Sequence, residues 1–184
     1  MNPIDPTRRG FLATASGLLV FSHAAPLDAQ QPAAAARRPS YSTDFNAYLR
    51  IGAEGRVTCL TGKVDMGQGE MTALAQCLAD ELDVAYDSVD MLMGDTELCP
   101  WDGGTGSSNC IQSFSLILRR AAAEARAVLL QMAAETLPAP VERLKVEAGV
   151  VTDPVQNKRI AYTQLVQGKR TERHLGSIPM KSPA

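Results

Sequence analysis

The order strand, glycine-rich loop, helix occurs twice in this chain and constrains its fold more than any other feature. The first copy has the loop 62–69 and a helix from about residue 70; the second has the loop 94–109 and a helix over about 111–136. Apolar residues recur in both helices at steps of three and four, so each helix has one face to bury. Two such helices need a common apolar surface, which a sheet made by the preceding strands can provide.

Short runs rich in β-branched and aromatic residues predict those strands. Residues 47–51 and 56–61 flank the turn 52–55 as a hairpin, and residues 89–93 alternate as a third strand. We expect the hairpin and the third strand to share one sheet. The predicted fold class is α+β, with a small mixed or antiparallel sheet and two helices packed on it.

Prolines end the second helix, because Pro138 and Pro140 cannot continue it. Beyond them a small hairpin about Ala148-Gly149 is expected, followed by a short strand or helix over 160–166. Residues 171–184 lack a periodic pattern and are expected to be an irregular tail.

Composition excludes several classes of function. The chain has 184 residues, 45% of them hydrophobic, with 18 basic and 20 acidic side chains, which excludes collagenous, disordered and polybasic nucleic-acid-binding proteins. The two histidines are His23 and His174, too few for a histidine-rich zinc centre. A Ser-His-Asp triad would have to use His174, which lies close to the carboxyl end.

Residues 1–36 have the order of an export signal. Arg8-Arg9 precede Gly-Phe-Leu and a weakly apolar run, and an alanine-rich tract closes the segment at 33–36. This favours the twin-arginine pathway and a periplasmic protein over an ordinary basic signal or an untargeted tail. The apolar run is too short and too polar for a stable membrane span. Residues 37–44 then form a polar linker.

The four cysteines form no C-x-x-C pair, and free thiols are the favoured interpretation. Cys59 lies in a predicted strand and Cys77 on an apolar helix face, where a buried thiol behaves as a small apolar side chain. Cys99 and Cys110 flank the second glycine-rich loop, where a disulfide could form.

The two loops are the candidate binding site. Gly67, Gln68 and Gly69 form the first, and Gly103 to Ser108 form the second, each directly before a helix. Glycines let backbone N–H groups approach a ligand, and a helix start adds unpaired donors, so both loops would suit a phosphate. The alternative is two tight turns, with Asn109 capping the second helix. Neither loop carries the full dinucleotide or P-loop pattern.

The runs Val64–Glu70, Thr72–Gln76 and Leu78–Val84 resemble the molybdopterin-binding subunit of the xanthine dehydrogenase and aldehyde oxidase family. The resemblance is to the branch of the isoquinoline 1-oxidoreductase beta-subunit type, which includes nicotinate dehydrogenase-like subunits. Gly94–Thr96, Gly103–Ser108 and Arg119–Arg126 are similar in order and spacing. The resemblance covers about residues 45–170 and implies a partial molybdopterin-binding domain there.

This resemblance implies a molybdenum hydroxylase that inserts oxygen from water into an N-heterocycle or aldehyde. Its cofactor would be molybdopterin with molybdenum, in some members as the cytosine dinucleotide. An iron–sulfur subunit, and in exported members a cytochrome, would take the electrons. Carried over from the family, the cofactor-binding residues are Gly67, Gln68, Gly69, Thr105, Ser107 and Ser108.

The resemblance also implies that this chain is incomplete alone. Family subunits are several times longer, and their catalytic glutamate lies far downstream. Glu70, Glu81 and Glu97 lie near the loops, but none matches that base, and Glu81 is expected on a solvated helix face. A second chain would then carry the missing domains. Two alternatives remain: a periplasmic module that binds a small anion, and a gene fragment without function.

Overall fold

The computed structural model describes residues 40–167, 172–176 and 178–182. All of them belong to one compact unit that begins at Pro39. The expected export signal, residues 1–36, lies outside the described residues and stays a prediction.

One mixed three-stranded sheet joins the predicted hairpin to the predicted third strand. β1 (Leu49–Ile51) is antiparallel to β2 (Val57–Thr61), and β2 is parallel to β3 (Val89–Met93). The parallel pair is connected by α2 (Glu70–Leu82) and the short 3₁₀ helix η2 (Tyr86–Ser88). A parallel pair needs such a crossover, because a tight turn can join only antiparallel neighbours. The expected shared sheet is confirmed.

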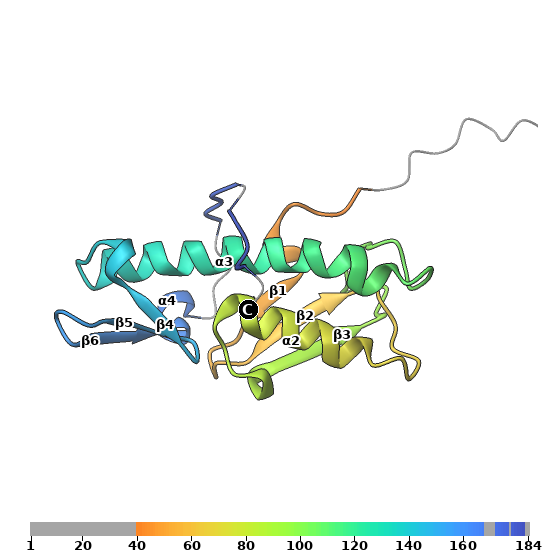
Figure 1. The fold of residues 1–184 in the computed structure, drawn as a ribbon, viewed down its shortest axis with the longest axis horizontal. Helices are drawn as coiled ribbons and strands as arrows, with labels where there is room; N and C mark the ends of the chain where they lie inside the picture. Colours follow the sequence, from red (N-terminus) through yellow and green to blue (C-terminus); the bar gives the residue numbers. More distant parts are fainter. Residues whose placement is uncertain (1–39, 168–171, 177, 183–184) are drawn as a thin grey trace, which may run out of the picture. The chain divides into compact units, whose positions relative to one another are not determined.

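The second long helix begins with a π-helical turn, η3 (Cys110–Phe114), and continues as α3 (Ser115–Thr136). α2 packs against the first part of α3, and both bury their apolar faces with the sheet (Figure 1). This main core contains Tyr48, Leu49, Val57, Cys59, Leu74, Leu78, Leu82, Phe114, Leu118, Ala122 and Val128. The expected α+β arrangement of two helices on a small sheet is therefore confirmed.

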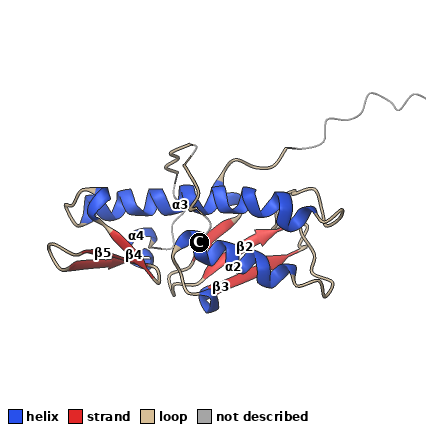
Figure 2. Cartoon of the chain, viewed as in Figure 1, coloured by secondary structure: helices blue, strands red, loops and turns tan. Residues whose placement is uncertain are grey.

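A second sheet follows the prolines. It is an antiparallel meander of β4 (Lys145–Glu147), β5 (Val150–Asp153) and β6 (Lys158–Ala161), coloured red in Figure 2. The first two strands are the predicted hairpin. For residues 160–166 the sequence allowed either a short strand or a helix, and the structure has the end of β6 followed by a helix. α4 (Tyr162–Val166) comes next, and its Tyr162 and Leu165 pack with the last turns of α3 in a second core. The 3₁₀ helices η1 (Phe45–Ala47) and η4 (Val141–Arg143) complete the fold.

Two alternatives that the sequence left open are excluded, and the favoured interpretation of free thiols is confirmed. Asn109 does not cap the second helix: its backbone is already helical, and its side chain makes no capping hydrogen bond. All four cysteines are free, so Cys99 and Cys110 form no disulfide. Cys99 instead donates its thiol to the Leu92 carbonyl at 3.4 Å. Cys59 is buried as expected, whereas Cys77 is only half-buried.

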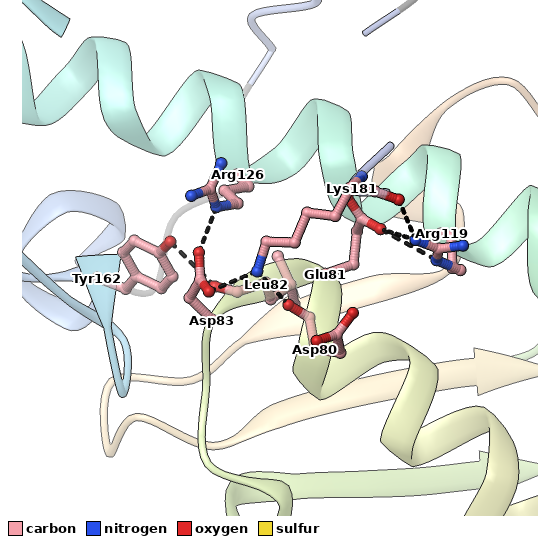
Figure 3. Close-up of polar contacts among 8 residues, drawn as sticks. All are labelled: Asp80, Glu81, Leu82, Asp83, Arg119, Arg126, Tyr162 and Lys181. Carbon is pink, nitrogen blue, oxygen red and sulfur yellow. Dashed lines mark hydrogen bonds and ion pairs between the residues drawn. The ribbon is translucent and has the colours of Figure 1, made fainter. Parts of the chain in front are cut away.

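The expectation that Glu81 lies on a solvated helix face is wrong. Glu81 is only 1% exposed, because α2 turns this side toward α3. There the Arg119 guanidinium donates from Nε to Glu81 Oε2 at 3.0 Å, as Figure 3 shows. A charged residue beside an apolar stripe is usually solvated, but an arginine on a facing helix lets it be buried.

Candidate functional site

Both glycine-rich loops lie at one edge of the first sheet. β2 and β3 are parallel, so the loops that leave their carboxyl ends start side by side (Figure 1). The Val64 N–H donates to Thr105 Oγ1 at 2.7 Å, which ties the first loop directly to the second. The prediction that the two loops meet is therefore confirmed at the contact between Val64 and Thr105.

A buried ion pair lies beside this contact between the two loops. Lys63 is 1% exposed and Asp102 is 2% exposed, with Lys63 Nζ 3.7 Å from Asp102 Oδ1. The same ammonium donates to the carbonyl of Asp102 at 2.7 Å and to that of Gly104. Thr61, the last residue of β2, donates its hydroxyl to Asp102 Oδ2. Lys63 thus fixes the backbone of the second loop to the strand that starts the first.

In the first loop, the Asp65 carboxylate accepts hydrogen bonds from backbone N–H groups. Asp65 accepts hydrogen bonds from the N–H groups of Gly67 and Met71, both at 2.8 Å. These bonds lower the pKa of the Asp65 carboxyl below its usual range, with Met71 at the start of α2 having the largest effect. The carboxylate therefore occupies the place at this helix start where a phosphate was expected.

Asp65 should make the stability of the chain depend on pH. Because its pKa is lower in the folded chain than the usual value of about 3.9, its contribution is complete above that value and is lost as the pH falls through the folded-state pKa. We expect Asp65→Asn to be less stable than wild type at pH ~7, with the difference shrinking toward pH ~3. Urea denaturation at both pH values measures it. Glu97→Gln, at an exposed position of the second loop, is the control. A difference independent of pH would contradict the assignment.

Gln68 is also engaged within its own loop. Its Oε1 accepts from the Met66 N–H at 2.6 Å, and its Nε2 donates to the Val64 carbonyl at 3.0 Å and to Glu70 Oε2 at 2.9 Å. Both amide protons are used, so in this conformation Gln68 offers a ligand only a lone pair. Gly67 and Gly69 have positive φ angles of 97° and 79°, with open space where a side chain would point.

The second loop is open. Nothing lies within 4 Å of the positions where a side chain on Gly104 or Gly106 would point. Ser107 and Ser108 are exposed, with left-handed φ angles of 50° and 53°, and their hydroxyls make no hydrogen bond within the described part of the chain. No side chain caps the helical turn that follows. These groups form a set of hydrogen-bond donors at a helix start, as phosphate binding requires.

The same edge carries exposed apolar side chains. Met66 is 78% exposed, and Val64, Met71, Leu98, Trp101 and Ile111 are between 45% and 48% exposed. A loop tryptophan can either cover a site or pack on the core; Trp101 is half-exposed, with its ring 5.8 Å from that of Tyr41. Tyr41 belongs to the expected linker 37–44, yet its ring lies 6.2 Å from Phe114 in the core.

One acid beneath the loops has an unused acceptor. Glu70 is 3% exposed, and its Oε1 has no hydrogen-bond partner among the described residues. Burial and the neighbouring Glu70 raise the pKa of the Cys110 thiol at the start of η3, so this cysteine is a poor nucleophile. Within the described residues, no group of three metal-binding side chains is found, and no helix is long and apolar enough to cross a membrane.

Sequence reasoning missed the residues that hold the loops in place. Asp65 had a local signal, since an aspartate two residues before a glycine is typical of a turn in which the carboxylate accepts a backbone N–H. Lys63 and Asp102 had no local sequence signal. They lie 39 residues apart, and each resembles an ordinary surface charge in the sequence.

Comparison with known proteins gives the family. Residues 11–181 match the family model described as the molybdopterin cofactor-binding domain. A nicotinate dehydrogenase subunit of Pseudomonas putida is 36% identical over 96% of this chain and 15% of its own length. The beta subunit of isoquinoline 1-oxidoreductase from Brevundimonas diminuta is 31% identical over 87% of this chain and 22% of its own length. The solved structure of quinoline 2-oxidoreductase from Pseudomonas putida 86 aligns with a TM-score of 0.54 and 32% identity, over 64% of this chain and 15% of that one.

The chain therefore belongs to the molybdopterin cofactor-binding domain family. Its relatives include the nicotinate dehydrogenase and isoquinoline 1-oxidoreductase subunits, which confirms the resemblance to molybdopterin-binding subunits. The chain spans 15% and 22% of the length of these two relatives.

The two loops fit different parts of a phosphorylated pterin. The second loop, with open glycines and free serine hydroxyls, fits a phosphate. The first loop does not, because Asp65 already accepts its N–H groups. Its open glycine backbone and the exposed Met66 side chain fit a flat ring instead. Asp65 therefore competes with a phosphate for the N–H groups of the first loop, and cofactor binding by the two loops stays a prediction.

Proposed function

We propose that this chain is the cofactor-binding part of a molybdenum hydroxylase that acts on an N-heterocycle or an aldehyde. The observation that carries the proposal is the second loop, an uncapped helix start with open glycines and unused hydroxyls in a chain of the molybdopterin-binding family. Other domains, on a second chain or a longer one, would complete the substrate pocket and supply the catalytic base.

Gly106, Ser107 and Ser108 would hold the phosphate end of the cofactor. The backbone N–H groups at this helix start carry partial positive charge, and the two hydroxyls can rotate to donate to phosphate oxygens. Thr105 uses one lone pair to accept from the first loop and can still donate its own proton.

Gly67, Gln68 and Gly69 would lie against the pterin. The loop is kept rigid by its internal hydrogen bonds, so it loses little conformational freedom when the cofactor binds. The remaining lone pair of Gln68 Oε1 offers an acceptor for an N–H group of the pterin.

The bound cofactor would supply molybdenum on a dithiolene, with which oxygen from water is inserted at an electron-poor carbon. The balanced reaction releases two electrons and two protons for each hydroxylated carbon, so an electron acceptor is required. An iron–sulfur subunit would take the electrons and, in an exported enzyme, pass them to a cytochrome. The cofactor could be molybdopterin or its cytosine dinucleotide.

Metal and pterin analysis tests this function. The protein is purified from its own host with whatever co-elutes, and we expect molybdenum and a fluorescent oxidised pterin in equal amounts. The binding-module alternative predicts a bound anion without molybdenum. The fragment without function predicts neither, and either result would contradict the proposal.

We further propose that the chain is periplasmic and exported by the twin-arginine pathway. Only the residues Arg8-Arg9 before a weakly apolar run support it. Replacing both by lysine should leave the precursor in the cytoplasm, as measured by cell fractionation. The same change at the second arginine pair, Arg37-Arg38, is the matched control and should not alter export. Normal export of the Arg8→Lys, Arg9→Lys protein would contradict the pathway.

A further inference from the structure

A buried ion pair lies where α2 meets α3. Arg119 on α3 donates to Glu81 on α2 at 3.0 Å from Nε, and its Nη2 lies 2.9 Å from the same carboxylate oxygen (Figure 3). The Glu81 side chain is 2% exposed and that of Arg119 is 17% exposed. Neither helix supplies a partner for the second carboxylate oxygen of Glu81 among the described residues.

The backbone of Lys181 supplies that partner. Its N–H donates to Glu81 Oε1 at 2.9 Å, and its carbonyl accepts from Arg119 Nη2 at 2.7 Å. One acid and one base thus bind the N–H and the C=O of a single residue. Charge-assisted hydrogen bonds of this kind are about twice as strong as neutral ones.

The side chain of Lys181 makes a separate set of contacts. Figure 3 shows it reaching the end of α2, where its ammonium contacts the Asp80 carbonyl and the Asp83 carboxylate. Asp83 Oδ2 also accepts from Arg126 Nε on α3, at 2.5 Å. A cation at this position is favourable, because the carboxyl end of a helix carries partial negative charge.

The charges of the two helices already pair at this junction, Glu81 with Arg119 and Asp83 with Arg126. The Lys181 ammonium is a second cation beside Asp83. Loss of the Lys181 N–H would leave Glu81 Oε1 without its donor, and a buried polar atom without a partner costs far more than one in water.

We propose that residues 178–182 form a strap that locks α2 to α3 by presenting the Lys181 backbone to the Glu81–Arg119 pair. α2 starts at the first glycine-rich loop and α3 continues from the turn after the second. The strap therefore also fixes the relation of the two loops, although it lies away from them.

Two substitutions at Lys181 distinguish the contribution of its backbone N–H from that of its side chain. Lys181→Ala removes the ammonium but keeps the N–H, whereas Lys181→Pro removes both. Ser182→Pro is the control, because no hydrogen bond of the Ser182 N–H is found within the described chain. Amide hydrogen exchange is measured for the strap, both helices and both loops in the full chain.

We expect exchange in the strap to rise from wild type to Lys181→Ala and again to Lys181→Pro, the second step being about tenfold, as for the loss of a hydrogen bond to a charged group. In Lys181→Pro, exchange should also rise at the end of α2, in α3 around Arg119 and in the loop 62–69. Equal exchange in the Ala and Pro variants would overturn the backbone contact. If exchange rises in the strap of Lys181→Pro but stays at the wild-type rate in both helices and both loops, the proposal that the strap locks the helices is wrong. The proposal is also wrong if Ser182→Pro raises exchange as much as Lys181→Pro does.

Discussion

Asp102→Ala is expected to lower the free energy of unfolding by about 3–5 kcal/mol, the usual cost of removing one partner of a buried ion pair. The variant would leave the Lys63 ammonium 1% exposed and without its counter-charge. It would also remove the acceptor of the Thr61 hydroxyl. Urea denaturation measures the loss as a shift in midpoint at constant slope.

Asp90→Ala is the matched control. Asp90 pairs with Arg56 on the same sheet, but the two side chains are 49% and 45% exposed, so water replaces much of the lost interaction. We expect a much smaller loss there. The double variant Lys63→Met, Asp102→Leu should recover part of the stability, since it leaves no buried charge unpaired. Equal losses for Asp102→Ala and Asp90→Ala would contradict the buried pair.

The parts of the fold that follow from local pattern were predictable from the sequence. The steps of three and four from Leu74 to Leu82 place α2, and alternation over Val89–Met93 places β3. The shared sheet follows because two apolar helix faces need one surface. The meeting of the two loops was expected because each follows a strand of that sheet and opens a helix, and the parallel pairing of β2 and β3 is what brings them to one edge.

The interactions that hold the helices and the loops in place join residues far apart in the chain. Glu81 pairs with Arg119, 38 positions later, and binds the backbone of Lys181, 100 positions later. No local pattern distinguishes such an acid from a solvated one. The same holds for Lys63 and Asp102, and for the left-handed backbone of Ser107 and Ser108, which no glycine marks.

The positions of the candidate residues could be predicted better than their hydrogen bonds. Gly67, Gln68 and Gly69 lie at the expected edge, but Asp65 and Glu70 use the donors that a ligand was expected to meet. A short carboxylate within bonding range of a helix start competes with any external anion there. No carboxylate is found hydrogen-bonded to the N–H groups of residues 103–108 in the second loop within the described part of the chain, so we propose phosphate binding for this loop alone.

Gly106→Val should lower the amount of retained cofactor strongly and should change the stability of the free chain little. Gly106 does not have a positive φ angle, and nothing lies within 4 Å of an added Cβ, so we expect the protein to accommodate valine there. The same side chain would fill the space proposed for the phosphate. We expect retained cofactor to fall about tenfold or more, as for the loss of one hydrogen bond to a charged group. Gly69→Val is a poorer test, since φ is 79° there and the backbone would be strained.

Gly52→Val is the matched control at the opposite end of β2. Its φ is not positive either, and the three atoms nearest to an added Cβ all belong to the flexible carboxylate group of Glu54. Unfolding midpoints of the two variants should lie close to wild type. Any loss of cofactor in Gly106→Val then reflects the site and not the fold.

Molybdenum and pterin per mole of protein, compared between Gly106→Val, Gly52→Val and wild type purified with their partners, test the central claim most directly. We predict that Gly52→Val retains the wild-type amounts and that Gly106→Val loses both molybdenum and pterin together. Wild-type amounts in Gly106→Val would contradict the claim that the second loop holds the phosphate of the cofactor.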